Sequence, residues 1–239
     1  MEISHGERLR RRIAGGGLLP FAGVWDVASA LAASRHVDGL LVSSAALASS
    51  LHGAADPELV SWSDLVSFVQ RVRTVLPDAH LLVDVGSGWD RTRARHILPQ
   101  LETAGASAIL IRGARGGASL AGAIGAALAA RRGLLVLAGT PAEGPAETAR
   151  ELEALARSGA DALLVSGVSD LAPLRAMAGR LPVPFGAALS GRLAASRREL
   201  EEAGVSLLLD ETTCLEAAEA GIVSAAAALA RPGPEAPAG

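Results

Sequence analysis

One stretch of the sequence, residues 80–90, combines an acid, flexible glycines and the pattern of a buried strand. It reads His-Leu-Leu-Val-Asp-Val-Gly-Ser-Gly-Trp-Asp, so an apolar run delivers the carboxylate of Asp84 and then breaks into a glycine-rich turn. A buried strand that ends in an acid and a loop is how an α/β barrel presents chemistry at its mouth. The same pattern suits a turn whose aspartate only satisfies backbone N–H groups. The local sequence leaves both interpretations open.

Other candidate residues follow strand-like runs elsewhere in the chain. Trp25 and Trp89 come after the first and third runs, where an indole ring either lines a binding site or packs at its rim. Asp210 and Glu211 end the last run, which places two more acids at the same end of the predicted sheet. Cys214 has no histidine partner in a known pattern, so we expect a buried structural thiol.

The composition excludes several classes of function. All 22 basic residues are arginines, which rules out a Schiff-base lysine and a P-loop lysine. The net charge of -3 offers no basic field for nucleic acid, and the single cysteine builds no disulfide framework and no cysteine-rich metal cluster. No apolar run approaches the length of a membrane span, and residues 2–12 are charged rather than signal-like. We therefore expect a cytoplasmic protein that binds neither nucleic acid nor membrane.

Apolar runs alternate with helical patterns along the chain. Strands are predicted at residues 18–24, 39–42, 81–83, 109–111, 133–138, 163–165, 183–187 and 207–209. Helices are predicted at residues 27–35, 62–76, 91–104, 120–131, 145–158, 171–179, 194–203 and 215–230. Gly105, Gly159 and Gly204 each end a helix directly before a strand.

This alternation predicts an α/β protein, a single-domain (β/α)8 TIM barrel. Strands that alternate with helices form a parallel sheet, and eight units of this size favour closure. A doubly wound open sheet would carry a G-x-G-x-x-G turn after its first strand, whereas glycines 15–17 precede that strand. We divide the chain into an N-terminal helix at residues 1–17, the barrel at 18–230 and a proline-rich disordered tail at 231–239.

Several of these segments, in this order, resemble the phosphoenolpyruvate mutase/isocitrate lyase superfamily, and its short phosphonomutase-type members in particular. The segments are residues 23–30 (Gly-Val-Trp-Asp-Val-Ala-Ser-Ala), 39–46 (Gly-Leu-Leu-Val-Ser-Ser-Ala-Ala), Asp56 ahead of residues 61–62, and residues 84–89, 104–106, 158–162 and 204–205. The resemblance covers about residues 9–230. It implies a TIM barrel and a homotetramer whose last helix is exchanged between subunits.

The resemblance also implies a chemistry. Its members hold a 2-oxo acid or its enolate on Mg²⁺ at the barrel mouth, where the metal stabilises negative charge as a C–C or P–C bond breaks. Asp84 matches the first acid of the family's Asp-x-Asp pair, and Asp56 matches a further acid near the metal. The predicted substrate-binding residues, which include the serine segment that cradles a carboxylate or phosphonate, are Trp25, Asp26, Ser43, Ser44, Ala45, Ser87, Trp89 and Ser166.

The sequence departs from the family pattern at several positions. Gly86 stands at the second acid of the pair, and Arg112 stands at a metal-linked glutamate. Gly139 replaces a substrate-binding arginine, and Ser166 replaces a glutamate or histidine. The family's long lid is missing, because residues 115–117 lead almost at once into the next helix. With fewer acids and an added arginine, we expect no metal, although the resemblance itself points to Mg²⁺.

We hypothesise that Arg112 reaches Asp84, since neighbouring parallel strands place such side chains within pairing distance. Its guanidinium would then take the position and charge of the metal and steady an anionic substrate. The predicted catalytic residues are Asp84, Arg112 and Asp56. The other interpretation is a plain ion pair that stabilises a barrel without activity.

The function expected from these residues is that of a divergent lyase- or mutase-like enzyme. Its substrate would be a small 2-oxo acid that bears a carboxylate or phosphonate, handled without metal in specialised metabolism. The alternatives are a non-catalytic barrel and a repurposed decarboxylase, hydrolase or condensing enzyme, since a fold does not fix its chemistry. The expected partners are a small anionic substrate and further copies of the chain, as a dimer or tetramer.

Overall fold

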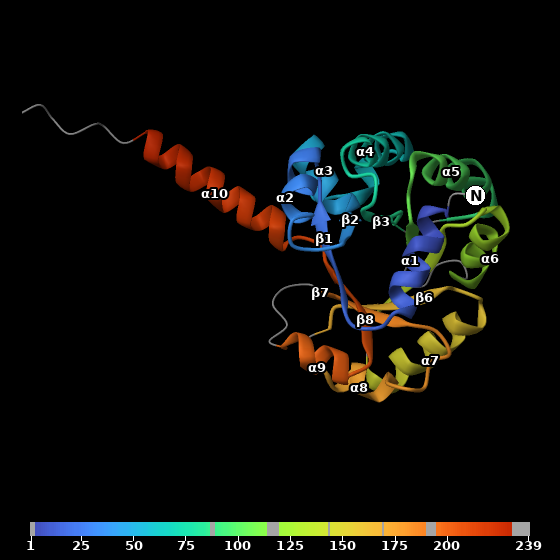
Figure 1. The fold of residues 1–239 in the computed structure, drawn as a ribbon. Helices are drawn as coiled ribbons and strands as arrows, with labels where there is room; N and C mark the ends of the chain where they lie inside the picture. Colours follow the sequence, from blue (N-terminus) through green and yellow to red (C-terminus); the bar gives the residue numbers. More distant parts are fainter. Residues whose placement is uncertain are drawn as a thin grey trace, which may run out of the picture.

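Eight parallel strands close into a barrel in a computed structural model of the chain (Figure 1). The structure describes residues 3–86, 89–113, 120–142, 144–168, 170–189 and 195–230. Each strand pairs with the next one in the chain, and the last pairs with the first. The strands are β1 (Leu19–Val24), β2 (Gly39–Val42), β3 (His80–Asp84), β4 (Ala108–Arg112), β5 (Leu135–Pro141), β6 (Ala162–Ser166), β7 (Phe185–Leu189) and β8 (Val205–Asp210). The predicted (β/α)8 barrel is confirmed.

Helices connect the strands around the barrel, and two more, α1 and α10, come before the first strand and after the last (Figure 1). They are α1 (His5–Ala14), α2 (Val27–Ala33), α3 (Ser44–His52), the 3-10 helix η1 (Pro57–Leu59), α4 (Trp62–Val75), α5 (Arg91–Ala104), α6 (Leu120–Ala130), α7 (Pro145–Arg157), α8 (Ala172–Met177), α9 (Arg197–Glu202) and α10 (Thr213–Leu229). None of the described helices has both the length and the hydrophobicity to cross a membrane.

Two strands begin two residues later than predicted. Strand β5 starts at Leu135 rather than at residue 133, because the N–H groups of Gly133 and Leu134 bond the carboxylate of Glu102 instead of a neighbouring strand. Strand β7 starts after Pro184, which has no N–H group to donate to a ladder. The predicted tail at 231–239 lies outside the described residues.

The last helix, α10, extends away from the barrel (orange to red in Figure 1). None of its residues is buried, and the side chains of Ile222 and Val223 are both 68% exposed. Cys214 lies on this helix and is exposed, so the prediction of a buried thiol was wrong. The helix leaves the barrel instead of packing on it, and this direction exposes the thiol.

Side chains of the strands alternate between two cores, one inside the barrel and one between the strands and the helices. Leu82, Leu110 and Leu209 belong to the inner core. The residue two positions after each of these leucines therefore also faces inward, at the carboxyl end of the barrel. This rule places the side chains of Asp84, Arg112 and Glu211 at the barrel mouth.

Helix α1 closes the opposite, N-terminal end of the barrel. Leu9, which is 1% exposed, joins the inner core, and Ile13 packs against it. Gly6 allows this close approach, because a β-carbon there would lie 2.1 Å from the carbonyl oxygen of Gly133. The predicted N-terminal helix is therefore a plug of the barrel.

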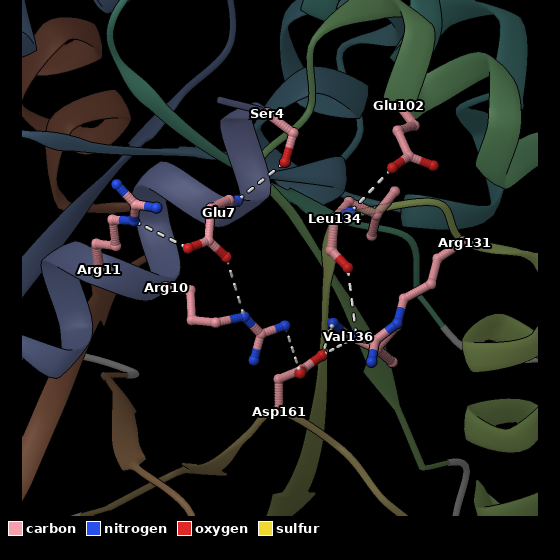
Figure 2. Close-up of polar contacts among 9 residues, drawn as sticks. All are labelled: Ser4, Glu7, Arg10, Arg11, Glu102, Arg131, Leu134, Val136 and Asp161. Atoms are coloured by element: carbon pink, nitrogen blue, oxygen red, sulfur yellow. Dashed lines mark hydrogen bonds and ion pairs between the residues drawn. The ribbon is translucent and has the colours of Figure 1, made fainter. Parts of the chain in front are cut away.

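A group of charged side chains fixes α1 in place, and we call Arg10, Arg131 and Asp161 the base cluster (Figure 2). Asp161 lies just before β6, and its side chain is only 7% exposed. Its carboxylate accepts hydrogen bonds from Arg10 Nη2 at 2.9 Å and from Val136 N at 2.8 Å, and it forms an ion pair with Arg131. Glu7 neighbours Arg10 on the outer side, with 3.8 Å between Oε2 and Nε.

Candidate functional site

Three charged side chains meet across the barrel mouth, and we call Asp84, Arg112 and Glu211 the mouth cluster. The Nε atom of Arg112 donates to Asp84 Oδ2 at 2.9 Å. Its Nη2 atom donates to Glu211 Oε1 at 2.5 Å. Strands β4 and β8, which carry Arg112 and precede Glu211, are four places apart in the ring of eight strands. The arginine side chain therefore bridges opposite sides of the mouth.

The mouth cluster holds more negative than positive charge. Burial by itself would lower the pKa of Arg112, but the charges and hydrogen bonds of Asp84 and Glu211 outweigh it and raise that pKa above its usual value. Burial raises the pKa of Glu211, and the charges of Asp84 and Asp210 add to this effect while Arg112 opposes it. One permanent cation is thus shared by two carboxyl groups, one of which holds its proton more tightly than usual.

Gly23 makes room for Glu211 at the closure of the barrel. A β-carbon at Gly23 would lie 2.3 Å from the carbonyl oxygen of Glu211, so only glycine lets the end of β8 come this close to β1. Gly139 pairs with Arg112 in the register of β4 and β5 and adds no side chain to the mouth. A β-carbon at Gly139 would lie 3.3 Å from Leu110 Cδ1 and 3.8 Å from Arg112 Cγ, so the glycine that replaces the expected substrate-binding arginine lets these side chains pack against β5.

Asp84 is held firmly at the end of β3. Its Oδ1 atom accepts a hydrogen bond from Gly86 N at 2.9 Å, while Oδ2 receives Arg112. Asp84 therefore satisfies a backbone N–H group and also forms an ion pair at the barrel mouth. Gly86 has a φ of 70°, a conformation that an acid at this position would adopt only with strain.

The predicted serine cradle supports the local backbone. Ser44 Oγ donates to the carbonyl oxygen of Asp84 at 2.5 Å, and Ser43 Oγ accepts from Ala46 N at 3.2 Å as the cap of α3. Both serines are buried, and Ala45, which follows them, is half-buried. The cradle therefore stands beside the mouth cluster, with the Ser44 hydroxyl committed to Asp84.

Two of the predicted acids cap helices. Asp26 accepts from Ser29 N at 2.6 Å as the cap of α2, and Trp25 N donates to Ser29 Oγ at 3.1 Å. Asp56 is exposed and accepts from Glu58 N at 3.0 Å as the cap of η1. No hydrogen bond or ion pair between described residues connects Asp26 or Asp56 with the mouth cluster. Their predicted roles find no support in these contacts.

Two further predicted residues, Trp89 and Ser166, lie at or after the carboxyl ends of strands β3 and β6. Trp89 is half-buried against the outer core, and its Nε1 atom donates to the carbonyl oxygen of Val85 at 2.9 Å. Ser166 ends β6 and donates to the carbonyl oxygen of Thr140 at 3.4 Å. Ser87 lies outside the described residues, as does the segment 115–117 on which the missing lid was predicted. The roles of these residues stay predictions.

Sequence reasoning placed Glu211 at the correct end of the barrel but did not include it among the site residues. Two signals point to it: its place two residues after the inward-facing Leu209, and Gly23 on the strand that closes against β8. Among the described residues, no group of three or more His, Cys, Asp or Glu side chains is arranged to hold a metal ion. The contacts of the mouth cluster centre on the guanidinium group of Arg112.

Comparison with solved structures finds the same barrel in several enzymes. A 2,3-dimethylmalate lyase, described as a member of the PEP mutase/isocitrate lyase superfamily, matches with a TM-score of 0.84 and 20% identity over 99% of this chain and 93% of its own. The phosphoenolpyruvate phosphomutase of Streptomyces platensis subsp. rosaceus matches with a TM-score of 0.83 and 21% identity over 95% and 87%. A phosphonopyruvate hydrolase in complex with oxalate and Mg²⁺ gives 0.84 and 21% over the same shares.

Sequence comparison gives a second, independent assignment. No curated protein matches the chain. The family model for phosphoenolpyruvate phosphomutase, however, matches residues 9–230, which is nearly the whole described barrel. The resemblance noted in the sequence is confirmed, and the chain belongs to the phosphoenolpyruvate phosphomutase family, within the PEP mutase/isocitrate lyase superfamily.

Proposed function

We propose that the mouth cluster is the active site of a divergent lyase- or mutase-like enzyme. Its substrate is a small 2-oxo acid that bears a carboxylate or a phosphonate. The observation that carries the proposal is the inward-facing guanidinium of Arg112, held 2.9 Å from Asp84 at the barrel mouth. Cleavage of a C–C or P–C bond next to a carbonyl group leaves negative charge on the enolate oxygen, and a fixed cation stabilises this charge.

Arg112 retains donors for a ligand. Its Nε and Nη2 atoms are used by Asp84 and Glu211, whereas no described residue accepts a hydrogen bond from Nη1. A guanidinium group binds carboxylates and phosphonates well, because its N–H groups lie in one plane and match two oxygens at once. Asp84 orients the group from β3, since its own position is fixed by Gly86.

The donor set supports a reaction without the family's Mg²⁺. Both oxygens of Asp84 already accept hydrogen bonds, one from Arg112 and one from Gly86. A magnesium ion prefers several oxygen ligands, and here it would meet a guanidinium group at its first carboxylate. Gly86 and Arg112 also replace two acids of the family pattern, so the charge that attracts a divalent cation is reduced.

Turnover of small 2-oxo acids by the wild type and by Arg112→Ala tests this proposal. We expect Arg112→Ala to lose at least about a hundredfold in kcat/KM, the range reported for removal of one oxyanion-stabilising group. Unfolding curves of both proteins serve as the control for folding. Activity of the wild type should be unchanged by EDTA. Unchanged turnover of a folded Arg112→Ala variant, or activity that appears only with added Mg²⁺, would overturn the proposal.

One observation favours a non-catalytic barrel as the second candidate. Arg112 is already bound by two internal carboxyl groups, which is the arrangement of a structural ion pair. In that case no 2-oxo acid is bound or converted, and the only effect of Arg112→Ala is on stability.

We further propose that the protein assembles as a homo-oligomer, a dimer or a tetramer. The support is α10, where Ile222, Val223 and Leu229 are at least 68% exposed although they are large and apolar. A second copy of the chain would cover this helix, as the family resemblance suggests. Sedimentation velocity of the wild type and of a chain shortened after Thr212 tests this, and a monomeric wild type at micromolar concentration would contradict it. We also propose that the protein is cytoplasmic.

A further inference from the structure

The mouth cluster contains a carboxylate where the proposed ligand would place its own. Glu211 Oε1 lies 2.5 Å from Arg112 Nη2. The proposed substrate would present a carboxylate or phosphonate to the same guanidinium group, so an internal group already occupies one half of the planar face formed by Nη1 and Nη2. The occupant comes from the opposite side of the barrel, since Glu211 follows β8 and Arg112 ends β4.

An anionic ligand cannot simply be added to this arrangement. With Asp84 and Glu211 both in place, a bound carboxylate would become the third acid around one guanidinium group, and Asp210 lies next in the chain. Like charges at this separation repel each other strongly, because the mouth is partly shielded from water. Either Glu211 leaves Arg112 or the ligand binds weakly.

The two acids differ in how firmly they are held. Asp84 lies within a strand, receives a hydrogen bond from Gly86 N, and has its carbonyl oxygen bonded by Ser44. Glu211 comes after the end of β8, and its carboxylate has Arg112 as its one polar partner among the described residues. Its side chain is also longer by one methylene group and 23% exposed, against 10% for Asp84. Glu211 is therefore the exchangeable partner and Asp84 the fixed one.

We propose that Glu211 is a specificity-determining residue, an internal carboxylate that a ligand carboxylate must displace from Arg112. The proposal rests on the anion site assigned to Arg112 under the proposed function and adds a competitor to it. When Glu211 moves away, Nη1 and Nη2 together present a two-pronged donor face for one small carboxylate. The site thus favours ligands whose carboxylate binds this face with both oxygens, and it discriminates against anions that make a single weak contact.

Binding of oxalate measured by calorimetry, without added divalent metal, tests the competition. Oxalate is a suitable probe because it is small and because it occupies a phosphonopyruvate hydrolase of the same fold. We expect Glu211→Gln to bind oxalate about tenfold more tightly than the wild type or better, since the substitution removes the competing charge but keeps the shape. Arg112→Met should bind none. Glu202→Gln, an exposed change on α9, is the matched control and should bind as the wild type does.

The outcomes separate this inference from the proposed function. If the wild type and Glu211→Gln bind oxalate equally well and Arg112→Met does not, the anion site stands and the competition is wrong. If neither the wild type nor Glu211→Gln binds oxalate at millimolar concentration, the anion site itself is wrong, and the inference falls with it. Should Glu211→Gln not fold, Glu211→Ser provides the same removal of charge with a smaller side chain, and its expected affinity also exceeds that of the wild type.

Discussion

The two ends of the barrel use the same chemical groups in opposite proportions. At the mouth cluster, one arginine is shared by two carboxyl groups, those of Asp84 and Glu211. At the base cluster, one carboxylate, that of Asp161, is shared by two arginines. The base cluster also includes a backbone donor, Val136 N, so every oxygen of its acid has a fixed partner.

This difference agrees with the division that we propose, in which the base cluster serves stability and the mouth cluster serves a ligand. The base cluster bonds α1 to the strands, and Glu7 beside Arg10 brings its charges into balance. The mouth cluster has an excess of acid, because Asp210 stands beside Glu211 and no second arginine among the described residues offsets it. In TIM barrels, residues at the N-terminal face contribute to stability and those at the C-terminal face to chemistry. The imbalance of charge follows the same division.

Removing the shared acid of the base cluster should give the largest effect. Asp161→Ala leaves Arg131 without its buried partner and Val136 N without an acceptor, so we expect the free energy of unfolding to fall by about 3 kcal/mol. Urea unfolding measures this. The exposed pair of Arg198 and Glu202 is the control, where Glu202→Ala should change stability by about 0.5 kcal/mol or less. Equal losses of unfolding free energy in both variants would show that the base cluster stabilises the fold no more than an exposed ion pair does.

A medium effect is expected when the approach of β1 to β8 is blocked. Gly23→Ala places a β-carbon against the backbone of Glu211, so the chain must shift, at a cost of about 2 kcal/mol. The shift also moves Glu211 from Arg112, and oxalate affinity should rise as it does in Glu211→Gln. Gly122→Ala on α6 is the matched control, because its new β-carbon meets no atom within 4 Å. A Gly23→Ala variant as stable as Gly122→Ala would contradict the crowding at the mouth.

The smallest expected effects concern pH, and they have opposite signs at the two ends. Burial raises the pKa of Glu211 above its ordinary value of 4.5, so the folded state holds the proton more tightly than the unfolded state does. Its stabilising contribution is present at low pH and is lost as the pH rises through the raised pKa. On α1, burial and then the charges of Arg73 and Arg8 lower the pKa of His5 from 6.5 to about 4. Its contribution is present above pH 6.5 and is lost as the pH falls toward 4.

Urea unfolding between pH 4 and pH 8 measures both contributions. Relative to the wild type, Glu211→Gln should gain stability as the pH rises. His5→Gln should lose less stability than the wild type as the pH falls below 6.5. If the differences in the free energy of unfolding among the three proteins stay constant over this pH range, the protonation of neither Glu211 nor His5 is linked to folding as described.

Much of the barrel and part of the mouth could be predicted from the sequence, because both depend on local patterns. The alternation of apolar runs and helices predicts the fold, and a strand end such as Asp84 or Arg112 has its neighbour on the next strand. Glu211 depends instead on the closure of β8 against β1, which brings together residues from the two ends of the chain. The ion pair of Arg10 and Asp161 in the base cluster joins residues 151 positions apart, and no local sequence pattern signals it.

Two residues show what the sequence pattern leaves out. Asp56 matches an acid of the family pattern, and the structure places it in an exposed loop, where its carboxylate caps η1; its role at the site stays a prediction. Cys214 was predicted to be buried because it has no histidine partner, but helix α10 leaves the barrel and exposes it. In both cases the sequence identifies the element correctly and gives no information on its direction.

The direction of α10 has a mechanical consequence for the mouth. The helix is about 26 Å long, and it starts two residues after Glu211, with its first turn capped by Asp210 through Thr213 N at 3.0 Å. Only residues 211 and 212 separate β8 from α10, so the position of Glu211 is coupled to the direction of the helix. We therefore expect contacts that hold the far end of α10 to affect Glu211 as well, so dilution or truncation of the chain should alter how tightly the guanidinium group accepts an outside anion.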